Sequence, residues 1–130
     1  MAVASLLVET DLPIMMTCID GAGIEKGTLL KMTTPLTAAA ASADNDVWAG
    51  VAAEEKISGD GKTKIAVYVR GIFGLTAGAA GITCGKPVSI SGANAVIDSA
   101  AGDNDLGYCA GKALETGAVG VVCAVFVGLI

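Results

Sequence analysis

Few side chains in this chain of 130 residues are of types that could do chemistry, and they form no catalytic set. The sequence has no histidine, so a serine or cysteine nucleophile lacks its usual base. Glu54 and Glu55 could act as a carboxylate pair in acid–base catalysis, but adjacent strand residues point to opposite faces of a sheet. We therefore interpret them as the solvated base of a hairpin. No glycine motif opens a helix as phosphate binding requires, and we expect no enzymatic activity.

Ligands for a metal ion occur only in weak patterns. The Asp-Asn-Asp triplets at 44–46 and 103–105 lack the further acidic ligand and the glycine spacing of a calcium loop, so we predict that they cap turns. The four cysteines have neither CxxC spacing nor a histidine to complete a zinc site. We predict free thiols, with Cys109 and Cys123 buried in strands, and neither a metal nor a cofactor.

The composition predicts self-association. Hydrophobic residues make up 53% of the chain and only 4% is aromatic, and the mean hydropathy is +0.67. Monomers seldom expose large apolar patches, so this excess argues for surface that is buried against copies of the chain or another protein. Residues 71–130 hold four of the 13 acidic and two of the eight basic side chains. We expect the contacts in this second half.

The charge pattern excludes several partners. A net charge of −5 with no basic cluster argues against nucleic acid, whose binding needs Lys and Arg at the phosphates. Residues 117–130 are apolar but too few for a membrane helix, so we predict no membrane span. The first residues lack a positive n-region and soon reach Glu9 and Asp11, so we predict synthesis in a cytoplasm without a secretory signal.

The same order of sequence motifs occurs twice along the chain. The strands that must position any site belong to this repeat. Offsets between the matched features run from 57 (71 to 128) to 61 (49 to 110), so the halves are one β-unit with loops of different length. We place the repeats at about 23–73 and 81–130, each ending on a strand. The matches are 23–27 with 81–85, 44–46 with 103–105, Ala49-Gly50 with Ala110-Gly111, and Glu54 with Glu115.

Short apolar runs between Gly and Asp turns predict a mainly β fold with little helix, a small barrel or sandwich built from two similar halves. The alanine and serine run at 38–43 predicts a loop or a helical turn. Residues 1–12 form a predicted N-terminal arm with no local partner strand, and residues 13–130 form a single β-rich domain.

The side chains best suited to bind a partner are Trp48, Tyr68 and Arg70, because these residue types are enriched at interaction hot spots. Trp48 could instead fill a small core. Along the strand at 64–69, alternation puts Ile65, Val67 and Val69 in the core. Tyr68 and Arg70 then lie on the other face. The predicted interface consists of these three side chains and four apolar residues of the arm: Val3, Leu6, Leu7, Val8, Trp48, Tyr68 and Arg70.

Two segments carry a resemblance to a known family. VWAGVAAEEKISGDGKTKIAVYVRGIF, at 47–73, resembles tailed-phage head-decoration proteins, in which a strand leads through a Gly and Asp hairpin to a strand ending Val-x-Val-Arg-Gly. GLTAGAAGITCGKPVSISGANAVI, at 74–97, followed by LGYCAGKALETGAVGVVCAVFV, at 106–127, is similar to the related capsid cement proteins, with their "Gly-Lys-Pro-Val" and final Gly-rich strands. The resemblance covers about residues 23–130.

This resemblance implies a β-tulip-like cement protein on the outer surface of the expanded virion capsid. Its partners would be the major capsid protein and itself, as a homotrimer, and it would clamp neighbouring capsid subunits and stabilise the shell. In that family the N-terminal segment orders on the capsid, which residues 1–12 could do by adding a strand to an open sheet edge. Two other classes stay open: another oligomeric virion protein associated with a tail or fibre, and a small carbohydrate-binding or adhesive β-module.

Overall fold

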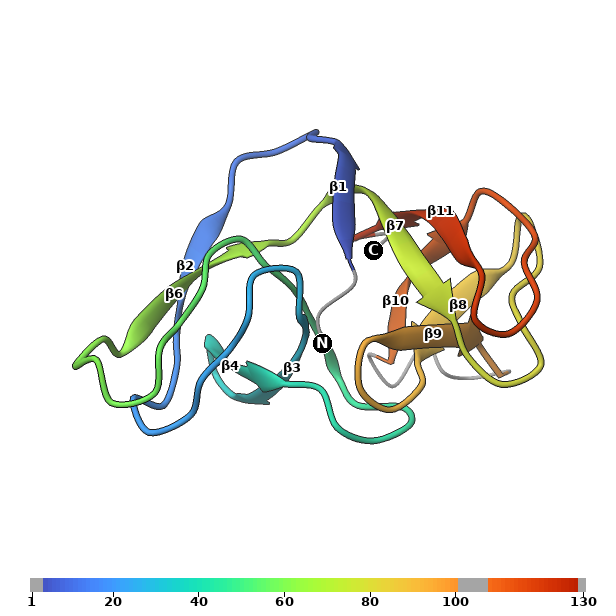
Figure 1. Cartoon of the computed structure of the whole chain (residues 1–130). Coiled ribbons are helices and arrows are strands. Elements are labelled where there is room, and N and C mark those ends of the chain that lie inside the picture. The colour runs from blue at the N-terminus through green and yellow to red at the C-terminus, as the bar shows by residue number, and fades with distance from the viewer. Residues whose placement is uncertain (1–3, 101–107, 129–130) are drawn as a thin grey trace.

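The computed structural model describes residues 4–100 and 108–128, and this part of the chain contains β-strands and no helix (Figure 1). A helix that could cross a membrane is therefore not found in these residues. The strands are β1 (Ser5–Val8), β2 (Ile14–Thr17), β3 (Leu29–Thr34), β4 (Thr37–Ala40), β5 (Trp48–Ala52), β6 (Lys64–Tyr68), β7 (Gly71–Ala77), β8 (Pro87–Ile90), β9 (Ala95–Asp98), β10 (Cys109–Ala113) and β11 (Val122–Val127).

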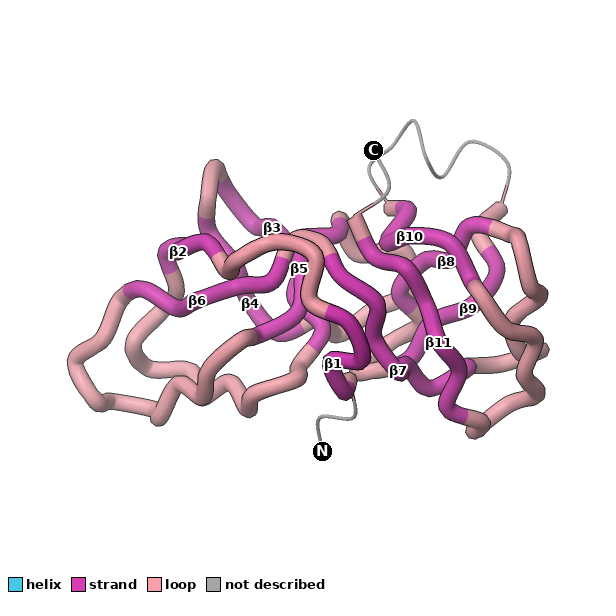
Figure 2. Tube along the Cα trace, turned by 90° about the horizontal axis from the view of Figure 1, so that it is seen from above, coloured by secondary structure: helices cyan, strands magenta, loops and turns pink. Residues whose placement is uncertain are grey.

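The strands form two barrels that lie side by side (Figure 2). The first barrel closes in the order β2-β4-β3-β5-β6. In the second, the order β7-β11-β10-β8-β9 closes through an additional pairing of β7 with β9. The predicted mainly β fold built from two similar halves is confirmed, and the choice between barrel and sandwich resolves to one small barrel per half.

The barrels have the same topology strand by strand, since β2 to β6 correspond to β7 to β11 in order. In each barrel the first strand pairs in parallel with the third and antiparallel with the fifth. Matching contacts occur at matching places: Thr17↔Thr37 with Thr76↔Ala95, and the isolated bridges Ile24↔Lys56 with Ile82↔Gly117. The sequence repeat therefore reflects a duplicated fold.

The structural repeats occupy 14–68 and 71–127, one strand earlier than the sequence motifs suggest. The run at 66–73, predicted as one closing strand, is divided: β6 ends at Tyr68 and β7 begins at Gly71. Gly71 has a φ of 151°, and a Cβ on it would lie 3.2 Å from the carbonyl oxygen of Val8. Glycine here permits both the change of direction and the close approach of β1.

Two groups of buried residues form the core. Inside the first barrel, Ile65 and Val67 are fully buried, as the alternation predicts, whereas Val69 of the same predicted set is only partly buried against them. A second cluster fills the second barrel and also includes Leu29, Ala41 and Val51 from the first half. Because this cluster crosses the junction, apolar burial joins the two barrels.

The repeated Ala-Gly…Glu motif has a structural cause. Gly50 and Gly111 lie at equivalent places in β5 and β10, and a Cβ on either would collide with a carbonyl of the neighbouring strand. The Glu54 carboxylate then accepts the N–H of Ala66 at 3.2 Å, and the equivalent Glu115 accepts the N–H of Ala124 at 2.7 Å. The interpretation of Glu54 as part of a solvated hairpin base is therefore wrong, since its carboxylate caps the backbone of β6.

The N-terminal segment, for which the sequence indicates no local partner, pairs with a strand far along the chain. β1 pairs antiparallel with β7, with Ser5 opposite Gly74 and Leu6 opposite Phe73. β1 can pair with this edge of β7 because β9 pairs only with Thr76 and Ala77, at the C-terminal end of β7. The first half of that β7 edge is left for β1, which lies at the junction of the barrels (Figure 2).

Candidate interaction surface

An uncharged sheet surface extends over the outside of the second barrel. In β11 the residues Cys123 and Val125 point into the barrel and are buried, so their neighbours point outward. Strand register places outward residues of β7 and β1 beside them. We call this surface the β1–β7–β11 face; it consists of Ser5, Val8, Ile72, Gly74, Thr76, Val122, Ala124 and Phe126.

The most exposed large side chains of this face are Val8 and Val122, at 50% and 58%. Leu7, at the irregularity in the β1 register, is 55% exposed beside them. Protein interfaces are depleted in charged residues at their centres, and this face has no charged member. Its composition suits contact with another protein surface.

Charged and aromatic residues fasten the segment after β1 at one end of this face. The Arg70 guanidinium lies 5.7 Å from the centre of the Phe126 ring and pairs with the Asp11 carboxylate at 3.6 Å. Burial raises the pKa of the Tyr68 hydroxyl, and the charge of Glu9, to which it is hydrogen-bonded, raises it further. Two of the predicted interface residues, Tyr68 and Arg70, thus hold the N-terminal segment against its own chain.

Tyr68 also packs into the junction between the barrels. Its ring meets that of Phe73 edge to face, with centroids 5.6 Å apart and planes at 60°. The structure therefore brings together Leu6, Leu7 and Val8 of β1 with the neighbouring Tyr68 and Arg70. Val3 lies outside the described residues.

Trp48 is not part of this grouping. It is half-buried in β5 and packs against the cluster that joins the barrels. Its indole Nε1 is buried, and in the described part of the chain it has no hydrogen-bond partner. This position agrees with the second interpretation given above, in which Trp48 fills a core.

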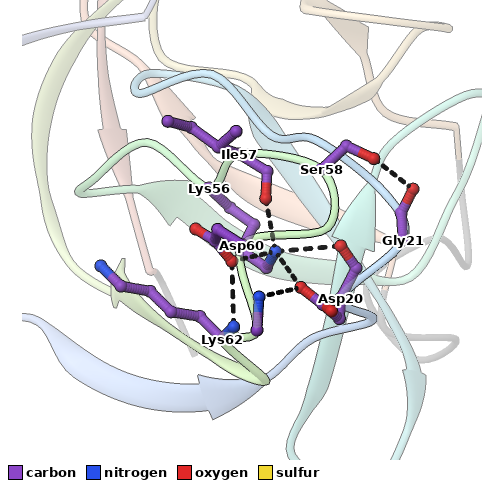
Figure 3. A network of polar contacts seen from close by, with 8 residues as sticks. Asp20, Gly21, Lys56, Ile57, Ser58, Asp60 and Lys62 are labelled. Atoms are coloured by element: carbon purple, nitrogen blue, oxygen red, sulfur yellow. Dashed lines mark hydrogen bonds and ion pairs between the residues drawn. The ribbon is translucent and has the colours of Figure 1, made fainter.

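Sequence reasoning missed a polar cluster at the far tip of the first barrel (Figure 3). The Lys56 side chain is only 1% exposed. Its ammonium donates to the carboxylates of Asp20 at 2.9 Å and Asp60 at 2.6 Å, and to the backbone carbonyls of Asp20 at 3.0 Å and Ile57 at 2.7 Å. These bonds hold the loop after β2 against the loop after β5.

Electrostatics in this cluster favours the charged forms. Burial by itself would lower the pKa of Lys56, but hydrogen bonds to Asp60 and Asp20 outweigh it and raise that pKa. The hydrogen bond from Lys56, with a further bond from the Lys62 N–H, lowers the pKa of Asp60 to about 2. A protonated, fully engaged ammonium is a poor nucleophile or base, so we interpret the cluster as a structural link.

A pocket of about 350 Å³ lies beside this link. The hydroxyl of Ser58, one of its lining residues, donates to the Gly21 carbonyl at 2.8 Å, which again joins the two loops. The equivalent tip of the second barrel has Gly117 in place of Lys56, and Asp98 instead accepts from the N–H and hydroxyl of Thr83, both at 2.9 Å. The pocket is thus a feature of the first barrel's own loop link.

The first Asp-Asn-Asp triplet, at 44–46, has a structural role. The Asp46 carboxylate accepts the N–H groups of Ser42 and Ala43 at 2.8 and 2.9 Å. Burial would raise the pKa of Asp46, but these donors outweigh it and lower the pKa. The first triplet therefore caps a turn as predicted, while 103–105 lies outside the described residues.

The cysteines are free thiols as predicted, with Cys84 exposed and Cys18, Cys109 and Cys123 buried. Within residues 4–100 and 108–128, no three Cys, Asp or Glu side chains gather in a way that could hold a metal ion.

No protein-family model and no curated protein matches the chain. Among solved structures, the chain is similar to the crystal structure of the head fiber gp8.5 N base of bacteriophage phi29. The TM-score is 0.57, the sequence identity is 16%, and the alignment covers 89% of this chain and 92% of that chain. At this identity the likeness shows a shared fold that extends over almost the whole of both chains.

Proposed function

We propose that this chain is a structural protein of a phage virion, a decoration or cement protein that binds the outer surface of the expanded head. The observation that carries the proposal is the fold shared with a head fiber base over 89% of the chain. The sequence resemblance to head-decoration proteins at 47–73 points to the same setting independently. Fold alone does not imply function, so the surface must also fit the role.

The β1–β7–β11 face supplies such a surface. Its outward side chains are uncharged and include the exposed Val8 and Val122. The segment that follows its N-terminal strand is held by Arg70 and Tyr68, so we expect the face to be ordered before binding, and less entropy is then lost in the complex. We assign this face to contact with the major capsid protein or with a second copy in a homotrimer.

In this proposal the protein acts as a passive clamp. Each copy that bridges two capsid subunits adds interface whose free energy must be lost before the shell opens. The polar side chains described above cap turns and link loops, which is consistent with a mechanical role.

A second candidate is a base that anchors a fibre to the head without stabilising the shell, and the description of the similar structure as a head fiber base favours it. A carbohydrate-binding module has less support. Such modules stack exposed aromatic rings on sugars, whereas the five aromatic side chains here are all half-buried or buried.

The proposal is tested by co-sedimentation with expanded, undecorated heads assembled from the major capsid protein of the same genome. Saturable binding with a fixed number of copies per capsid subunit is the expected result. Native mass spectrometry of the free protein should show a homotrimer. Binding to tails or to free fibres but not to heads would contradict the capsid assignment.

A further inference from the structure

We propose that the open edge of β2, at Ile14 and Met15, accepts an extended, uncharged and apolar β-strand from a partner protein. The inference comes from comparing the two barrels of the chain with each other. It goes beyond the proposed function and holds whether or not the partner belongs to a phage head.

The repeat identifies which residues of β2 correspond to the edge that β1 fills on β7. In the first barrel Met15 pairs with Ala66 of β6, and in the second Gly74 pairs with Ala124 of β11. Thr17 and Thr76 are equivalent in the same register, and each begins the parallel pairing that closes its barrel. Met15 is therefore the counterpart of Gly74.

On β7 this edge is occupied. Ser5 lies opposite Gly74, and Leu6 lies opposite the next residue, Phe73. On β2, the pairing on this side is limited to Thr17 with Thr37, and no other described strand pairs with Ile14 or Met15 there. The first barrel thus has the acceptor edge without the added strand.

The backbone at this edge points in the direction that strand addition needs. Thr17 donates its N–H to Leu36 on the β4 side, whereas Cys18 donates to Thr63 on the β6 side. Because N–H groups alternate between the two edges of a strand, the Met15 N–H faces the β4 side, where its edge is open. Pro13, two residues earlier on the same side, has no N–H, so the added strand would accept from Met15 alone and donate to the carbonyl groups. An unpaired strand edge is a template for a further strand.

The side chains around this edge are apolar and exposed. Leu12, Ile14 and Met15 are 78%, 41% and 54% exposed. None of the residues from Leu12 to Met15 carries a charge, so a charged side chain on the added strand would find no partner among them. The occupant should resemble Ser-Leu-Leu-Val of β1, the strand that fits the equivalent edge.

The occupant is a segment of a different protein rather than of a second copy. Of the described strands, ten belong to the barrels and β1 alone is additional. Each copy therefore offers two acceptor edges and one strand to fill them, and that strand is already paired with β7. A β1 donated by another copy would leave that copy's own β7 edge open, so exchange between copies gains no net pairing.

The test uses the full chain and a capped peptide with the sequence of residues 4–8, Ala-Ser-Leu-Leu-Val, which carries no charge. Amide hydrogen exchange measured by NMR should slow at least tenfold at Met15 at saturating peptide. Exchange at Gly74 should stay unchanged, since β1 holds that edge intramolecularly. A peptide with both leucines replaced by lysine should give no protection.

Met15→Lys and Leu12→Lys should each weaken peptide binding at least tenfold, because a charge blocks an apolar edge. Ile57→Lys is the matched control, since Ile57 is 62% exposed in a loop outside β2. Unchanged exchange at Met15 would overturn the proposal, as would protection confined to Gly74. Self-association without peptide that Met15→Lys abolishes would show a second copy as the occupant and overturn it too.

Discussion

Substitution of Gly74 by glutamate tests whether the β1–β7–β11 face is the contact surface. Gly74 lies in the middle of the face, between Ser5 of β1 and Ala124 of β11. A Cβ there would lie 3.1 Å from Cγ1 of Val122 and 3.9 Å or more from Ser5. The tight neighbour is an exposed methyl group that can move by a few tenths of an ångström, so Gly74→Glu should fold.

The expected loss of binding follows from burying a carboxylate among apolar side chains. Leaving even a polar group unpaired in an interface costs about 2–7 kcal/mol, and a charge costs more. A loss of about 2.7 kcal/mol already corresponds to a hundredfold weaker Kd. We therefore expect Gly74→Glu to bind expanded heads at least about a hundredfold more weakly, with a free energy of unfolding within about 1 kcal/mol of wild type.

Binding is measured by titrating fluorescently labelled protein onto heads and separating the bound fraction by sedimentation. Gly21→Glu is the matched control, because a Cβ on Gly21 meets nothing within 4 Å and Gly21 lies in the loop after β2. Equal affinity of Gly74→Glu and wild type, with both folded, would refute the assignment of this face. Equal loss in both variants would point to a general effect of charge.

Three further predictions follow from the polar contacts. Arg70→Ala and Asp11→Asn should each speed amide exchange in β1 while costing less than about 1 kcal/mol of global stability, because the pair is half-exposed; unchanged exchange would mean that the pair does not hold the segment. The pKa of Asp60 is lowered to about 2 by its bond from Lys56, so its stabilising effect is complete above the ordinary value of 3.8 and is lost as pH falls through about 2; Asp60→Asn should flatten acid unfolding curves in that window. In native protein Cys84 alone should react quickly with a thiol reagent, because the other three cysteines are buried, and all should react after denaturation; rapid labelling of more than one thiol would contradict the described burial.

Sequence reasoning could predict the duplicated β fold because the constraints that carry it are local. Gly50 and Gly111 are required by close strand contacts, and Glu54 and Glu115 cap equivalent backbone groups. Such positions leave a visible motif. The alternation of inward and outward residues along β6 is equally local, and it predicts the burial of Ile65 and Val67.

Features that depend on distant pairing could not be predicted in this way. β1 pairs with β7, far along the chain, and an apolar strand at the N-terminus does not show which edge it will join. The alanine-rich Thr37–Ala40 becomes β4 because β3 supplies a partner strand, which local propensity does not reveal. Lys56 is a charged residue in a predicted hairpin, and its burial depends on the distant Asp20 as well as on the neighbouring Asp60.

The measurement that tests the account most directly compares the thermal disruption of expanded heads with and without this protein at full occupancy, followed by light scattering and genome release. A clamp that bridges capsid subunits predicts a higher disruption temperature for decorated heads, and Gly74→Glu at the same concentration should not raise it. Decorated and undecorated heads that open at the same temperature, with occupancy verified by cryo-electron microscopy, would contradict the clamping function and favour a fibre base.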